Sequence, residues 1–280
     1  MTSACAIYGY EFTREFTYQG MRFLPRYTWV TDANEKARDL TRYHLTGVVV
    51  LDNYDDHQIF CLEAVLSFIE HLDVLISDPL PLTDSDVFAP FPPVARTAKR
   101  HNGGGAVLHQ DAFFHEMRSD FIQLAMGKLA DDQFSEDTGW RTLFFKATVP
   151  FRQRSPYLEV SYFLLFSGLE TYVRRTLGDL GSPDVARLIS KRLRQLGFDI
   201  HTYRPNDLKR SADTYARLRN ALFHNSSLET TRRTKDGTVV NYKLLDYYAN
   251  FLILVSLVVV RASGFDHPRL HWDSWITMQQ

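Results

Sequence analysis

Ten almost entirely apolar residues follow one another at Phe251–Val260 (FLILVSLVVV), and they restrict the possible folds more than any other segment. Crossing a bilayer takes about 20 such residues, so this run is too short to be a membrane span. A helix that is apolar on nearly every side must be covered by other protein segments. The run therefore predicts a buried helix over Lys243–Ala262 with other helices packed around it.

The preceding segments can supply those helices. Apolar residues recur at helical spacing in Pro156–Leu177, Ser182–Leu196 and Pro205–His224. The first two open on a Ser-Pro pair, which is typical of a cap and first helical turn, and Gly197 ends the second. Four helices with short connections predict a bundle. We expect residues 151–280 to form an all-α domain of four to five helices.

The first half has a mixed pattern. Segments rich in Tyr, Phe, Thr and Val predict strands at Ala4–Phe12, Arg14–Tyr18, Met21–Val30, Tyr43–Leu51 and Thr142–Val149. Helical spacing predicts helices at Asp32–Leu40, Asp55–Ile76 and Asp111–Ala130. We therefore expect residues 1–150 to form a mixed α/β module, which makes the whole chain α+β. The boundary is expected in the segment from Pro150 to Pro156.

Charge is distributed unevenly between these halves. Residues 1–150 hold 13 Lys and Arg against 21 Asp and Glu, whereas residues 151–280 hold 19 against 12. The basic half is the candidate for a polyanionic partner, and the alternative is a solvated basic helix surface.

Composition narrows the class of protein. With 45% hydrophobic and 23% charged residues, the chain fits a soluble globular protein rather than a disordered one. Its two cysteines, Cys5 and Cys61, provide neither a disulfide scaffold nor a four-cysteine zinc site. The first residues lack the basic and apolar regions of a secretory signal. A cytoplasmic location is the expectation.

The helix predicted over Pro205–His224 ends in RNALFH, and these residues can carry chemistry. At about 100° per residue, Asn220 and His224 lie together opposite the core stripe, with Arg219 on the flank. A guanidinium and an imidazole suit phosphodiester cleavage, because arginine stabilises charge on phosphate oxygens and histidine transfers protons near neutral pH. Phe223 falls on the same face, which favours cover by a partner subunit. The alternative is a structural histidine favoured by the helix dipole.

Two further groups of polar residues accompany this motif. Glu170 and Arg174 are four apart, opposite the core stripe of their own helix, and without a functional role they are an exposed ion pair. Basic side chains on the first and second helices can contact RNA phosphates, or can simply be solvated. These candidate RNA-binding residues are Arg175, Lys191, Arg192 and Arg194.

An Arg-Asn-x-x-x-His ending on the third helix of a four-helix unit resembles the HEPN superfamily. The segment LEVSYFLLFSGLETYVRR looks like the opening helix of its Apea-like members. The resemblance covers roughly residues 155–262, and the first 150 residues resemble no family. It implies a metal-independent endoribonuclease, often a toxin or antiviral defence effector, that acts as a homodimer with one composite site made from both copies.

The resemblance also implies residue roles. Arg219 and His224 match the catalytic pair, Asn220 matches the polar residue that commonly follows the arginine, and Glu170 and Arg174 match a supporting element of some branches. The 2′-hydroxyl of the RNA would attack the adjacent phosphorus and leave a cyclic phosphate. No cofactor is expected, and an antitoxin or activating ligand is left open.

Other interpretations of the sequence remain open. The chain can be a non-catalytic module of the same type, which dimerises or binds nucleotides or RNA while the N-terminal half does the work. Asp52–Glu63 has a tyrosine and a histidine where a calcium loop needs a ligand and a glycine. His267 and His271 lack further ligands for zinc. No metal site is predicted.

Overall fold

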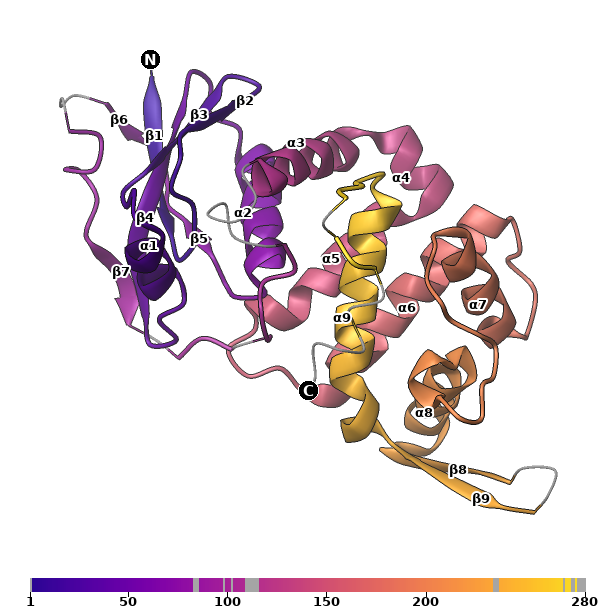
Figure 1. Cartoon of the computed structure of the whole chain (residues 1–280). Helices are drawn as coiled ribbons and strands as arrows, with labels where there is room; N and C mark the ends of the chain where they lie inside the picture. Colours follow the sequence, from indigo (N-terminus) through magenta and orange to yellow (C-terminus); the bar gives the residue numbers. More distant parts are fainter. Residues whose placement is uncertain are drawn as a thin grey trace. The chain divides into compact units, whose positions relative to one another are not determined.

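The fold is α+β, as predicted: strands of an antiparallel sheet come first along the chain, and helices dominate the rest (Figure 1). The computed structural model describes residues 2–82, 86–97, 99–101, 103–108, 116–233, 237–268, 270–272 and 275. The chain divides into two compact units, Met1–Ala130 with Thr148–Pro156, and Asp131–Ala147 with Tyr157–Gln280. Residues 131–147 thus lie in the second unit although they precede the predicted boundary.

Among the described residues, seven strands make one antiparallel sheet in the N-terminal unit. Its order is β2-β3-β4-β1-β5, with β6 paired to β1 and β7 paired to β4. The strands are β1 (Ser3–Tyr8), β2 (Phe16–Tyr18), β3 (Met21–Pro25), β4 (Arg42–Leu51), β5 (Leu75–Ile76), β6 (Leu80–Pro81) and β7 (Val94–Thr97). The ten-residue β4 pairs with β1, β3 and β7, so it organises the sheet. Four of the predicted strands are confirmed here: β1, β2 and β3 are shorter than expected, and β4 is one residue longer.

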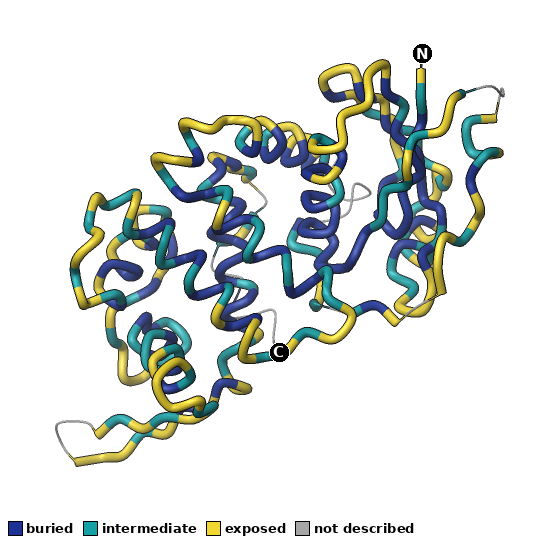
Figure 2. Tube along the Cα trace, turned by 180° about the vertical axis from the view of Figure 1, so that it is seen from behind, coloured by how far each residue is buried: buried dark blue, intermediate teal, exposed yellow. Residues whose placement is uncertain are grey.

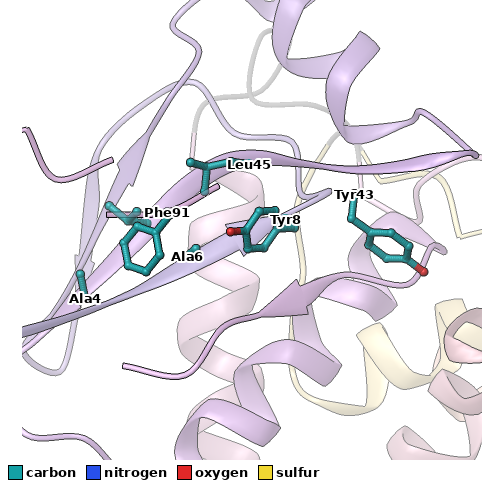
Figure 3. Packing of buried hydrophobic residues seen from close by; sticks show 7 residues of the cluster. Ala4, Ala6, Tyr8, Tyr43, Leu45 and Phe91 are labelled. Carbon is teal, nitrogen blue, oxygen red and sulfur yellow. The ribbon is translucent and has the colours of Figure 1, made fainter. Parts of the chain in front are cut away.

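The alternation of side chains along β1 explains the core of this unit. Ala4, Ala6 and Tyr8 point to one face, where Figure 3 shows them packed with Leu45 and Phe91. The residues between them on β1 are buried as well, so both faces of the strand are covered. Each large apolar side chain buried here contributes roughly 1.5–3 kcal/mol, which makes β1 and β4 the stable centre of the unit.

In the part of this unit that the structure describes, three helices accompany the sheet: α1 (Val30–Ala37), α2 (Asp56–Glu70) and α3 (Met117–Ala130). Asp55 caps α2, because its carboxylate accepts from the backbone N–H of His57 at 2.9 Å. The helix ends at His71, whose backbone is left-handed (φ 53°). The helix predicted over Asp55–Ile76 is therefore too long, since its last two residues form β5. The predicted helix start at residues 111–115 lies outside the described residues.

The second unit is mostly helical. Its helices are α4 (Asp132–Thr138), most of α5 (Trp140–Arg152), α6 (Leu158–Leu177), α7 (Val185–Gln195), α8 (Ala212–Asn225) and α9 (Leu244–Ala262), with a 3-10 turn η1 (Leu208–Arg210) before α8. By length and composition α9 passes as a membrane span, yet it is largely buried in this unit. Its carbonyl at Val259 accepts from the Trp140 indole N–H at 3.0 Å, which fixes α5 against it.

Two predictions about secondary structure are wrong. The segment Thr142–Val149 lies inside the helix α5 and not in a strand. The C-terminal half is not all-α, because β8 (Glu229–Arg233) and β9 (Val239–Lys243) form an antiparallel hairpin between α8 and α9. Exposed and half-buried residues alternate along this hairpin, which Figure 2 draws mostly in teal and yellow. Such a partly solvated ribbon leaves little apolar signal in the sequence.

Candidate active site

The carboxylate of Glu170 on α6 holds two guanidinium groups. Its Oε1 lies 2.8 Å from Nε of Arg174, one turn further along α6, and its Oε2 lies 3.2 Å from Nη2 of Arg219 on α8. The side chain of Glu170 is only 15% exposed. The alternative of an exposed ion pair is therefore wrong: Glu170, Arg174 and Arg219 form a half-buried triad, because α8 packs against this side of α6. Such a triad fixes geometry better than a surface pair does.

The Arg219 guanidinium is oriented by its neighbours on both helices. Its Nη1 donates to the side-chain oxygen of Asn220 at 2.9 Å. Its central carbon lies 5.5 Å from the ring centre of Phe166 on α6 and 5.7 Å from that of Phe223 on α8. A planar cation between two rings gains cation–π attraction, so few orientations remain open to it. The structure thus brings Arg219, Asn220, Glu170 and Arg174 together, which the sequence analysis had named as separate elements of the candidate site.

A cavity of about 250 Å³ opens beside this triad. Arg219, Asn220 and Phe166 line one side of it, and the start of α7 (residues 183–186) lines another. On its wall Asp213 is neutralised by Arg217 at 2.7 Å and Arg232 at 2.5 Å. A polar cavity of this size with a fixed guanidinium at its edge suits a small anionic group such as a phosphate.

His224 lies apart from the cavity. It is exposed near the end of α8, which finishes at Asn225 and is followed by a left-handed Ser226 (φ 49°). The imidazole meets the Phe223 ring edge-on, with ring centres 5.2 Å apart, and it is not among the cavity-lining residues. Within one chain, the structure therefore does not join the imidazole to the Arg219 network. Its one-turn spacing from Asn220 leaves both side chains on the exposed side of α8.

The four basic side chains predicted to bind RNA separate into two pairs. Arg175 donates to the backbone carbonyl of Glu136 in α4, and Arg192 donates to the Tyr172 hydroxyl at 2.9 Å while covering its ring. Both therefore take part in packing within the bundle. Lys191 and Arg194 instead line a shallow exposed hollow of about 520 Å³ on α7. Arg175, Lys191 and Arg194 are exposed and Arg192 is half-buried. Lys191 and Arg194 are therefore the exposed cations of the four whose side chains make no hydrogen bond, ion pair or ring contact with a described residue, as a phosphate contact requires.

Sequence reasoning identified Phe223 as an exposed apolar residue but missed its neighbours on α6. Phe223 is 62% exposed, and its ring stacks on that of Phe163 with centres 5.9 Å apart. Val160 and Tyr157 are also exposed, each three residues earlier along the chain. This apolar patch, consisting of Tyr157, Val160, Phe163 and Phe223, borders the Arg219 site. The signal was present in the three-residue spacing, opposite the predicted core stripe.

Comparison of the chain with protein-family models, with curated proteins and with solved structures found no match. Within the residues that the structure describes, no group of three or more His, Cys, Asp or Glu is arranged to hold a metal ion. Cys5 and Cys61 are both buried and form no disulfide, and burial raises the pKa of the Cys5 thiol to about 12. A functional assignment therefore rests on the Arg219 site and its surroundings.

Proposed function

We propose that the C-terminal unit is a metal-independent endoribonuclease whose active site combines Arg219 and His224 from two copies of the chain. The observation that carries the proposal is the contact of Glu170 with Arg219. Two sequence elements 49 residues apart, each singled out for the same chemistry, share one carboxylate. A guanidinium held in this way is ready to receive a phosphate without reorganising, which is the main requirement for electrostatic catalysis.

The chemistry needs no nucleophile from the protein. The 2′-oxygen of the RNA forms a bond to the adjacent phosphorus while the bond from phosphorus to the 5′-oxygen breaks, which leaves a 2′,3′-cyclic phosphate. His224 takes the proton of the 2′-hydroxyl or delivers one to the leaving 5′-oxygen. Arg219 stabilises the negative charge that grows on the phosphoryl oxygens. Glu170 and Arg174 do not touch the substrate in this scheme, because their part is to position Arg219.

A dimer accounts for the separation of His224 from the cavity in one chain. The apolar patch borders the site and needs cover, and a second copy of the chain can bury it while bringing its own imidazole to Arg219. A non-catalytic module is expected instead to bury this histidine against its own chain. The exposure of His224 therefore favours the catalytic hypothesis over the binding module.

The test is cleavage of total RNA by the full chain in EDTA. We expect fragments with cyclic-phosphate ends, and a loss of at least about 100-fold in rate for His224→Ala and for Arg219→Ala. His201→Ala is the matched control, since His201 is an exposed histidine of the same unit paired only with Asp199. If His224→Ala cuts as fast as the unmodified protein while His201→Ala is also unchanged, the assignment of the site is wrong.

A further inference from the structure

The N-terminal unit contains a cavity whose charge opposes that of its surroundings. It encloses about 340 Å³ and is lined by residues near β4 and β7, by the segment after β7 and by the end of α5. Five cations face it with a single carboxylate, namely Arg96, Lys99, Arg100, Arg152, Arg154 and Asp73. We call it the basic cavity. Three of these cations come from residues 1–150, which carry an excess of acidic side chains, and Arg152 and Arg154 come from the segment just after them.

One wall of the basic cavity is a buried guanidinium without a carboxylate contact. Arg100 is 2% exposed, and all of its hydrogen bonds go to backbone carbonyls, including those of Asp73 at 2.7 Å and Ala37 at 2.6 Å. Carbonyl groups solvate the cation but do not neutralise it. Its positive charge therefore acts on the cavity through a medium of low dielectric constant, where it is screened less than at the surface.

The single carboxylate is already shared. Asp73 accepts from the Tyr43 hydroxyl at 2.9 Å and lies 3.7 Å from Arg96 and 3.8 Å from Arg152. Arg152 also pairs with Glu63, which is not part of the lining. Arg96 also covers the Tyr43 ring, with its central carbon 4.8 Å from the ring centre. Two carboxylates against five cations leave the cavity with a net positive charge.

Two cations at the rim have no such engagement. Lys99 and Arg154 are exposed, and neither has a hydrogen bond or ion pair with any described residue. Thr97 and Gln153 beside them add a hydroxyl and an amide to the lining. A lysine offers a point charge and an arginine offers a fork of donors, and together they suit oxygens spread over more than one phosphate.

We propose that the basic cavity binds the polyphosphate group of a small phosphorylated ligand, such as a nucleotide. The volume is at the lower end of small-molecule pockets, about 300–1,000 Å³, which excludes a folded macromolecule as the occupant. The lining has two rings, Tyr43 and His101. Arg96 and Arg100 both cover the Tyr43 ring, which leaves it closed to a base, so the phosphate chain carries most of the recognition. This inference does not depend on the ribonuclease proposal, because its site and its assay are separate.

Binding of sodium tripolyphosphate and of ATP to the full chain, measured by calorimetry at fixed ionic strength, tests the proposal. We expect Lys99→Ala combined with Arg154→Ala to weaken both about tenfold or more, since charge-assisted hydrogen bonds are lost. Arg14→Ala combined with Lys36→Ala removes the same charge elsewhere in this unit and should leave affinity unchanged. Both altered rim side chains are exposed, so the fold is expected to persist, and Arg154→Ala alone provides a milder second variant.

The outcomes separate the possibilities. Equal affinity for the two ligands assigns recognition to the phosphate chain, and tighter ATP binding adds a contribution from the nucleoside; both support the proposal. The proposal fails if neither ligand binds, if both double variants weaken binding equally, or if the rim variants bind as the unmodified protein does. It also fails if the site takes only a 5′-phosphorylated RNA oligonucleotide that tripolyphosphate does not displace.

Discussion

At the scale of single residues, His71 shows how strongly burial controls a titrating group in this protein. Its ring is stacked on that of Phe151, with centres 4.0 Å apart and planes at 11°. The residue is 2% exposed, and burial, with Arg38 as a second cause, lowers the pKa of the imidazole from 6.5 to about 3. The folded state therefore keeps this histidine neutral, whereas the unfolded chain protonates it near its ordinary pKa.

A pH dependence of stability follows from that difference. Below pH 6.5 the unfolded state binds a proton at His71 that the folded state does not bind. The contribution of His71 to stability is therefore fully present above pH 6.5 and is lost as pH falls toward 3. We expect the free energy of unfolding to fall by up to about 1.4 kcal/mol per pH unit more than in His71→Asn. Asparagine tolerates the left-handed backbone at this position. Urea titrations between pH 7.5 and 4.5 measure both slopes, and parallel slopes would contradict the prediction.

At the scale of elements, local sequence pattern and tertiary packing disagree over α5. Thr142–Val149 is rich in aromatic and β-branched residues, so local propensity favours a strand. Yet Trp140, Leu143, Phe144 and Ala147 are fully buried, at the spacing of one helical face. Burial of that face outweighs propensity, and a longer window would have shown the period. The helices α6, α7, α8 and α9 were predictable because their apolar periods are long.

The β8–β9 hairpin and α4 were missed for a different reason. The hairpin is short and solvated, and its sequence signal was the Asp-Gly pair at residues 236–237 between β-branched runs. The helix α4 has a single large apolar residue, Phe134, and depends on its cap, since Asp131 accepts from the Phe134 backbone N–H at 2.8 Å. A prediction based on the periodicity of apolar residues does not detect elements that depend on turns and caps.

The triad also makes a prediction at the element scale, because Glu170 ties α6 to α8. In Glu170→Gln, Arg174 and Arg219 keep their charges but lose the carboxylate between them, and these half-buried cations then repel each other. We expect the free energy of unfolding to fall by about 1–3 kcal/mol. Glu159→Gln, an exposed change in the first turn of the same helix, should cost only a few tenths of a kcal/mol. Urea denaturation of both variants checks this, and equal small losses would show that the triad contributes nothing.

RNA cleavage gives that pair of variants a second readout. If Glu170 positions Arg219, the Gln variant should lose activity at temperatures where it remains folded, whereas Glu159→Gln should retain it. Full activity in a folded Glu170→Gln protein would show that Glu170 does not position Arg219. It would not test the roles of Arg219 and His224 themselves.

At the scale of the whole molecule, the sequence predicted which residues of the candidate site share a helix face. It did not predict the contacts that depend on assembly with a second chain. The α+β class followed from apolar patterning, and the resemblance named Glu170 and Arg219, but their contact was not predicted because it depends on how α6 and α8 pack. Spacing placed His224 beside Asn220 on one face of α8, but it does not show what covers that face. The geometry of a site that two chains complete depends on how the chains associate, and the residue pattern of one chain does not show this.

The apolar patch therefore makes a prediction about assembly. Phe223 lies against Arg219 and stacks on Phe163, and Val160 is exposed three residues earlier on α6. Burying these side chains against a second copy gains roughly 25 cal/mol per Å² of apolar surface. We expect the protein to sediment as a dimer and Phe163→Asp to raise its dissociation constant at least about tenfold, because a carboxylate would be desolvated in the apolar interface. Phe163 stacks on Phe223 and is the member of that pair without a ring contact to Arg219. Leu245→Asp is the matched control, since Leu245 is another exposed apolar residue, outside the patch. RNA cleavage should fall in parallel with dimerisation in the first variant and persist in the second. A monomeric wild-type protein at concentrations where it cuts RNA would overturn the composite site, since one chain alone leaves His224 away from the Arg219 cavity.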